Sequence, residues 1–404
     1  MSTQAIESLS EDTVRRIAEE RDEPEWLLET RLDALNALEA AALPDVIQTP
    51  GRRWTDLESL DFEALVDPLN QSDETERVGG DDEVVVLPFT EALDEYGDVI
   101  EANFGSVIDS EENYLTALSV ALFTTGTFVY VPEGVDVEDV TVRAEMNSRS
   151  LFSQTLVVAE ASSSITILES ISSGDGDAEG DRYFSNLVEI VAGENANVQF
   201  GSLQNLDDDT YTYSLKRGVT DTYATVDWIE SNFGSKLTRS DVETELTGDG
   251  SESQIVGTFF GTEDQHFDVN ARVWHKAEHT TADLVTRGVL DDVARSVYEG
   301  VQDVGQDAWN TSSYQRENTL MLSDDAEADA SPKLIIHNHD TEASHSATVG
   351  QVDAEDLFYL ESRSIDSRTA RNMLVEGFFV PVLEEIAVDE FRDDVEALVA
   401  ERLR

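Results

Sequence analysis

The feature that most constrains the fold of this chain is a long stretch, beginning near Thr127, in which apolar residues recur at every second position. That period is typical of β-strands, and turns of small or polar residues separate one run from the next. Helical segments are absent between the runs, which excludes a doubly wound α/β sheet. The expected strands include Thr141–Ala144, Thr155–Ala159, Ser164–Leu168, Asn186–Val191, Asn197–Gly201, Thr225–Ile229, Gln254–Phe259 and His266–Val273.

Three of the turns resemble one another. Val158–Ile165, Val191–Val198 and Leu246–Ile255 each join two apolar runs through small and polar residues. Repeated strand–turn units favour a β-solenoid, in which each coil buries its apolar side chains against the next. The spacing of the repeat is irregular, so a β-sandwich is the alternative.

Helical periodicity flanks the β region on its N-terminal side. Ser10 is placed to cap a short helix, and Pro24 fits the first turn of a second one. A further amphipathic helix is expected at Glu111–Phe123. The sequence therefore predicts a mainly helical region at 1–125, followed by a β core at 126–350.

A C-terminal helical region is expected at 351–404. Asp353 and Asp366 are N-cap candidates for two helices, the first ending at Arg363 and the second at Glu376. Gly377 is expected to break the chain, and Pro381 to open a last helix ending at Leu403. The predicted order is helix, long β region, helix.

The charge of the chain is extreme. Acidic residues outnumber basic ones 86 to 26, which gives a formal net charge of −60, spread over the whole length. In molar salt the Debye length falls to about 3 Å and most of this repulsion is screened. The composition therefore predicts a halophilic protein from a salt-rich cytosol, and it argues against nucleic-acid binding because no basic stripe is present.

Cysteine is absent, which excludes disulfides and thiolate ligands from this chain. The N-terminus carries no apolar leader, and no run approaches the roughly 20 apolar residues that span a bilayer. We therefore expect a cytoplasmic protein that does not enter a membrane.

All six histidines fall between His266 and His345. His275 and His279 form an H-x-x-E-H pattern, but a zinc protease needs that pattern on a helix, and the residues before it alternate as a strand. His337 and His339 lie two apart on an expected strand, so they would point the same way, and a polar strand face is favoured over a metal site. Glycine-rich phosphate loops and serine nucleophile elbows are also missing, so nothing in the sequence argues for catalysis.

Several segments are similar to a known family. The strongest is Ala343–Arg363, which resembles the C-terminal signature of the SufB/SufD family of iron–sulfur cluster assembly proteins, and of its SufD branch in particular. Further similar segments, in order along the chain, are Glu23–Leu32, Phe128–Gly134, Gly257–Gly261 with Gln265, His266 and Asp268, Arg287–Asp291, and Tyr314–Gln315 with Leu320–Asp324.

The resemblance implies a right-handed parallel β-helix flanked by helical regions. It also implies a non-catalytic scaffold that pairs with a SufB-like subunit and docks a SufC-like ATPase on its C-terminal helices, while an isolated chain can form a homodimer. No cofactor would be bound stably by this chain alone, and a transient iron–sulfur cluster would form at the SufB interface. The alternative is an acidic β-helix carbohydrate-active enzyme that works without partners, and a SufB identity is disfavoured because cysteine is lacking.

Residue roles follow only from this resemblance. His345 occupies the histidine position of a Cys-Ser-His-Gly stretch that the family links to cluster assembly, with Ala343 in place of the cysteine and Ser346 in place of the glycine. His345 is therefore the expected cluster-assembly residue and a candidate iron ligand, and a structural interface role is the alternative. The residues expected to contact the SufC-like ATPase are Leu357, Phe358, Tyr359, Phe378 and Phe379.

Overall fold

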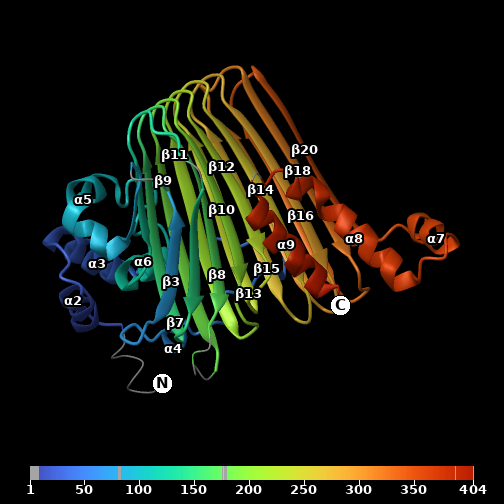
Figure 1. Cartoon of the computed structure of the whole chain (residues 1–404), viewed down its shortest axis with the longest axis horizontal. Coiled ribbons are helices and arrows are strands. Elements are labelled where there is room, and N and C mark those ends of the chain that lie inside the picture. The colour runs from blue at the N-terminus through green and yellow to red at the C-terminus, as the bar shows by residue number, and fades with distance from the viewer. Residues whose placement is uncertain are drawn as a thin grey trace.

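A computed structural model describes residues 9–80, 83–137, 139–174, 176, 180–386 and 388–403. The chain is mainly β: a solenoid of stacked coils runs through the middle of the molecule, with helices at both ends of the sequence (Figure 1). The predicted fold class is thus confirmed, and the β-sandwich alternative is wrong because, from β5 onward, each strand pairs in parallel with the strand two places along the chain, one coil away.

The solenoid consists of two nine-stranded sheets, and successive strands alternate between them. Sheet I contains, in spatial order, β3 (Asp73–Gly79), β6 (Val140–Met146), β8 (Ser164–Ser173), β10 (Asn197–Asn205), β12 (Thr225–Asn232), β14 (Glu252–Gly261), β16 (Thr281–Leu290), β18 (Thr311–Met321) and β20 (Thr341–Gln351). Sheet II contains β4 (Val85–Pro88), β5 (Thr127–Val131), β7 (Ser150–Ala159), β9 (Arg182–Ala192), β11 (Thr210–Thr220), β13 (Leu237–Leu246), β15 (His266–His275), β17 (Arg295–Val304) and β19 (Glu327–Ile336).

The strand register explains why this sequence forms a solenoid. Neighbouring coils place like residues in rows, such as Phe200 beside Trp228 and Trp228 beside Ile255, all of them buried between the sheets. Each apolar side chain therefore packs against the coil before it and the coil after it, which is how repeat folds build one continuous core. Turn positions require a left-handed backbone, adopted for example by Asn195 and Gly250.

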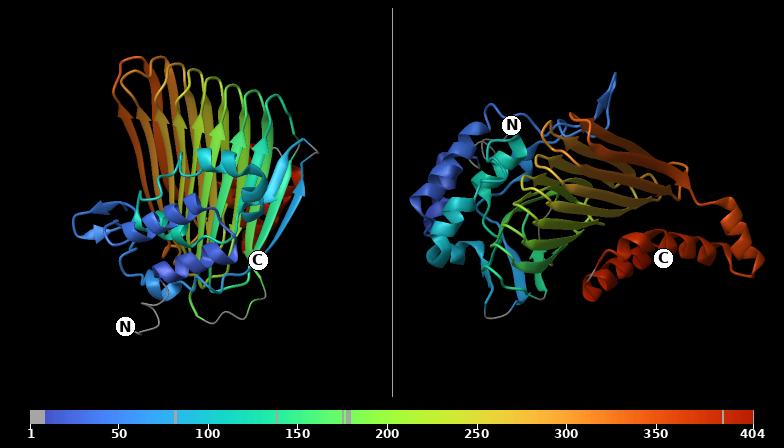
Figure 2. Two further views of the ribbon diagram at one scale, coloured as in Figure 1. Left: turned by 90° about the vertical axis from the view of Figure 1, so that its left-hand side faces the viewer. Right: turned by 90° about the horizontal axis from the view of Figure 1, so that it is seen from above.

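The N-terminal region closes one end of the solenoid and covers sheet II (Figure 2). Its helices are α2 (Glu11–Glu20), α3 (Glu25–Ala37), α4 (Phe62–Leu65), α5 (Phe89–Asn103) and α6 (Tyr114–Leu122), and it also contains a hairpin of β1 (Gln48–Thr49) and β2 (Arg52–Arg53). Ser10 caps α2 as expected, since its side-chain oxygen accepts a hydrogen bond from the amide of Thr13. The region also supplies β3 and β4, which pair antiparallel with β6 and β5.

The C-terminal region forms α7 (Ala354–Ser362), α8 (Ser367–Leu383) and α9 (Asp389–Arg402), and Asp353 and Asp366 cap α7 and α8 as predicted. The predicted break at Gly377 and new helix at Pro381 are wrong, because α8 continues through both residues. Packing explains the difference: the apolar side of α8 is buried against the outer face of sheet I, where Phe379 stacks on Phe260 with ring centroids 6.2 Å apart. That burial offsets the poor helix propensity of glycine and proline.

Candidate functional site

The two ends of the solenoid are finished differently. At the C-terminal end, β20 pairs only with β18 and β19 only with β17 among the described strands. Their side chains are partly or fully exposed on both faces of the strands. In the preceding coils, by contrast, the inward-facing side chains are buried. We call β19, β20 and the turn that joins them the open end.

His345 lies on β20 at the open end. It is in register with Gln315 on β18, whose side chain is buried inside the solenoid. Because residues paired across a parallel ladder share a face of the sheet, His345 also faces the interior, one strand closer to solvent. Its side chain is exposed, since no further coil covers it.

Two buried polar side chains lie in the coil beneath: Gln315 in register with His345, and Glu317 in register with Ala347. Gln315 donates from Nε2 to the hydroxyl of Tyr298 at 3.2 Å, and Glu317 accepts a hydrogen bond from Thr319. The remaining oxygens, Oε1 of Gln315 and Oε2 of Glu317, have no hydrogen-bond partner. Burial raises the pKa of Glu317 to about 7, and the hydrogen bond from Thr319 opposes that rise. The coil below the open end therefore offers unmatched acceptors.

Deeper in the solenoid, buried charges are matched. Lys216 on β11 lies 2.9 Å from the carboxylate of Glu230 on β12. Glu169, in the same axial row as Glu230 and Glu317, accepts a hydrogen bond from Asn186 at 2.7 Å, although burial still raises its pKa. Buried acceptors without a partner also occur in earlier coils, for example Oε1 of Gln154, but those of Gln315 and Glu317 lie in the coil next to the open end.

The H-x-x-E-H pattern has a structural role. His275 ends β15 and faces the interior, where its Nδ1 lies 2.8 Å from Oγ1 of Thr280. Burial lowers its pKa to about 4, so it is neutral at physiological pH. His279 lies in the turn that follows, with φ of 61°, so the two histidines do not share a helix face. The helical geometry of a zinc protease is excluded, as predicted.

Of the remaining histidines, His266 lies apart from His337 and His339. His266 begins β15 on the outer face of sheet II, where its Nε2 lies 3.2 Å from Thr55 Oγ1 and burial lowers its pKa to about 4. The prediction that His337 and His339 share a strand face is wrong, because β19 ends at Ile336 and both lie in the turn before β20. Within the described parts of the chain, no group of three or more histidine, aspartate or glutamate residues is arranged to hold a metal ion.

The predicted ATPase contacts divide into two sets. Phe358 and Tyr359 on α7 are 71% and 57% exposed, and α7 projects beyond the open end (Figure 1). Leu357 is half-buried. On α8, Phe379 is buried, and Phe378 is partly buried over the guanidinium of Arg287, 4.9 Å from its ring centroid. Of the five predicted contacts, Phe358 and Tyr359 on α7 are the exposed aromatic residues.

Sequence reasoning missed a groove between α8 and α9. It has a volume of 420 Å³ and is lined by apolar side chains that include Met373, Val380 and Val399. Met373 and Val380 are also among the exposed large apolar residues. The predicted break at Gly377 separated these residues into two helices, which hid the continuous apolar edge of α8.

Comparison with models of protein families shows which family this chain belongs to. A model described as "SUF system FeS cluster assembly, SufBD core domain" matches residues 141–378, and one described as "SufBD protein N-terminal region" matches residues 56–142. The chain belongs to the SufBD family. The family resemblance expected from the sequence is thus confirmed, and the core model spans the solenoid from β6 to the middle of α8.

Individual relatives in the SufBD family cover nearly the whole chain. The "Iron-sulfur cluster assembly protein SufD" of Bacillus subtilis is 29% identical and aligns over 98% of both proteins. A SufBD family protein of Staphylococcus saprophyticus is 26% identical over 94% of this chain and 90% of its own. One from Synechocystis is 26% identical over 98% and 93%. The chain is therefore a SufD homologue and an iron–sulfur cluster assembly protein. None of its described helices is long and apolar enough to cross a membrane.

Proposed function

We propose that this chain is a non-catalytic, cytoplasmic scaffold subunit that binds a SufB-like subunit and a SufC-like ATPase and supports ATP-dependent cluster assembly. The observation that carries the proposal is the uncapped last coil, which places His345 on the interior face of an exposed edge strand. Family membership favours this function over the alternative of a carbohydrate-active β-helix enzyme.

The open end is the proposed docking surface for the SufB-like subunit. Repeat folds need a cap at each end, and exposed edge strands readily pair with strands of another chain. A partner with the same solenoid can add its own last strands to β19 and β20 and so extend both sheets. A second copy of this chain can do the same, so the proposal extends to a homodimer when the chain is isolated.

Clusters are the substrate of such a complex, and this chain supplies only part of a ligand set. Imidazole can bind iron beside thiolates. Because cysteine is absent here, the thiolates must come from the partner, and His345 would complete the site from across the interface. The cluster is therefore held transiently at the interface and not by this chain alone.

The ATPase is proposed to dock on α7 and the adjoining edge of α8. Exposed aromatic side chains such as Phe358 and Tyr359 are the residue type that dominates protein–protein binding energy. Because α8 is packed on sheet I, a movement imposed on α7 would be transmitted toward the solenoid through a rigid helix.

Reconstitution tests the whole proposal. The chain is co-expressed with SufB-like and SufC-like proteins from the same genome, purified without oxygen, and examined by gel filtration and by iron and sulfide content. We expect a complex of all three proteins that accumulates clusters only when ATP is supplied. Equal cluster formation without this chain, or cleavage of polysaccharides by the chain alone, would contradict the proposal.

A further inference from the structure

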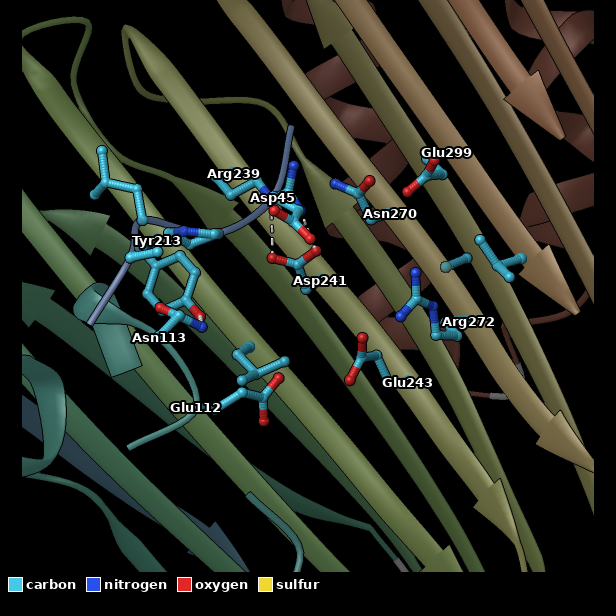
Figure 3. Close-up of a pocket in the computed structure, with 16 residues that line it drawn as sticks. Asp45, Glu112, Asn113, Tyr213, Arg239, Asp241, Glu243, Asn270, Arg272 and Glu299 are labelled. Carbon is cyan, nitrogen blue, oxygen red and sulfur yellow. Dashed lines mark hydrogen bonds and ion pairs between the residues drawn. The ribbon is translucent and has the colours of Figure 1, made fainter. Parts of the chain in front are cut away.

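A cleft of 360 Å³ lies on the outer face of sheet II, the sheet that the C-terminal helices do not cover (Figure 3). Its floor is formed by β11, β13, β15 and β17. The segment Ala42–Asp45 forms one wall, and Glu112 and Asn113, at the start of α6, form another. The volume is within the range of small-molecule sites.

Most charged groups on the floor already have a partner. Asp241 on β13 lies 2.8 Å from Arg239, which also reaches Asp268 at 2.9 Å. The other pairs join Arg217 to Glu112 and to Glu243, and Lys333 to Glu299. These carboxylates are therefore locally neutralised, and they fix the shape of the floor.

Arg272 on β15 is the exception. Among the described arginines it is the one that is not fully exposed and yet makes neither a hydrogen bond nor an ion pair; its guanidinium carbon lies 5.3 Å from the ring centroid of Trp274. No carboxylate of the described residues lies within ion-pair distance of the guanidinium, and its charge acts on Asp241 only at longer range, where it opposes the rise in the pKa of that carboxyl. A half-buried guanidinium has five donors to satisfy, and here they line the cleft.

Asp45 carries an unmatched charge of the opposite sign. It lines the same cleft and has no hydrogen-bond or ion-pair partner among the described residues. Apolar side chains complete the lining, namely Leu43, Pro44, Leu215 and Val301. Within the described residues, the cleft thus combines a half-buried guanidinium without an ion pair, an exposed carboxylate without a partner, and an apolar surface.

We propose that this cleft binds a small zwitterion of the α-amino-acid class, with its carboxylate on Arg272, its ammonium group toward Asp45 and its side chain against the apolar lining. A polyanion is disfavoured by the surrounding carboxylates, and a simple cation would leave Arg272 unpaired. A carboxylate matches the planar guanidinium in a bidentate geometry. This site is additional to the assembly function and does not depend on it.

Three matched probes test the proposal on the unmodified chain. L-leucine carries both charges, N-acetyl-L-leucine lacks the ammonium group, and L-leucinamide lacks the carboxylate. Binding is followed by saturation-transfer NMR and by the fluorescence of the tryptophans, one of which, Trp274, lies beside Arg272. We expect L-leucine to bind at least tenfold more tightly than either analogue. Equal binding of the three probes, or no binding of L-leucine, would overturn the proposal.

Variants of the two charged residues then test which group of the ligand each residue binds. Arg272→Gln should weaken L-leucine binding about tenfold or more, and Asp45→Asn should remove the preference for L-leucine over N-acetyl-L-leucine. Arg316→Gln is the matched control, because Arg316 is an exposed arginine on β18 that pairs with Asp283 on sheet I. Circular dichroism verifies that each variant is folded. Undiminished binding by Arg272→Gln would place the ligand elsewhere.

Discussion

The closed and open ends of the solenoid are built from the same strand repeat but differ in how they are finished. At the closed end, β3 and β4 terminate the sheets, and aromatic rings from helices and strands pack together, as Phe89 does on Phe123 at 5.4 Å. At the open end, Ile336 and Val349 are each 41% exposed. The chain therefore covers one end of the solenoid with its own N-terminal region and leaves the other end exposed for a partner.

Removing the imidazole of His345 at the open end should have the largest of the expected effects, a loss of cluster content. In the reconstituted complex, His345→Ala is expected to lose most of its iron and sulfide while gel filtration still shows all subunits together, because the side chain is exposed and contributes little to packing. His279→Ala is the control, since His279 is exposed in the turn between β15 and β16, two coils before the open end. Normal cluster content in the His345→Ala complex would leave that residue a structural role only.

Truncating the exposed aromatics of α7 should weaken ATPase docking. Phe358→Ala combined with Tyr359→Ala is expected to reduce affinity for the SufC-like protein about a thousandfold, at roughly 2 kcal/mol for each side chain. Isothermal titration measures the change, with Val293→Ser as the control because Val293 is exposed in another part of the molecule. Affinity within a factor of two of the unmodified chain would show that α7 is not the contact.

Truncating one side chain at each end of the solenoid tests whether the two ends contribute unequally to the stability of the fold. Phe152→Ala at the closed end should lower the free energy of unfolding by about 3–4 kcal/mol, because Phe152 is fully buried among aromatic rings. Val349→Ala at the open end should cost less than about 0.5 kcal/mol. Urea denaturation of both variants makes the comparison directly. Equal losses would show that the open end of the free chain is already covered.

The buried carboxyl next to the open end should make stability depend on pH. The pKa of Glu317 is raised from an ordinary 4.5 to about 7, so the folded state holds a proton that the unfolded state releases. Stability from this group is therefore greatest below pH 4.5 and falls as pH rises toward 7, by up to about 3 kcal/mol.

The measurement is the difference in unfolding free energy between the unmodified chain and Glu317→Gln across that window. Other buried acids, such as Glu243 and Asp227, remain in both proteins and cancel in the difference. The exposed Glu355→Gln on α7 serves as the control and should leave the profile unchanged. Parallel pH profiles for Glu317→Gln and the unmodified chain would contradict the prediction.

Local signals in the sequence predicted the fold class and the caps at Ser10, Asp353 and Asp366, because alternation and capping are properties of a few neighbouring residues. The helix through Gly377 was not predictable in this way, since the interaction that preserves it joins Phe379 to a strand more than a hundred residues earlier. Non-local packing outweighed local propensity there.

The candidate site was predictable only in part. The family resemblance selected His345, but its interior orientation depends on the register between β18 and β20, as does its position above Gln315. The cleft around Arg272 likewise joins the 42–45 segment to strands from the middle of the chain. Neither register nor such long-range contacts can be worked out from spacing along one segment.

The position of the closed end at the N-terminus has a consequence for synthesis. The ribosome releases the segment that caps the solenoid before it releases the coils, so each new coil can add to an edge that already exists. The apolar outer face of sheet I, with Phe260, stays bare until α8 emerges. A nascent chain that stalls before Ser367 would therefore display that surface to chaperones and proteases.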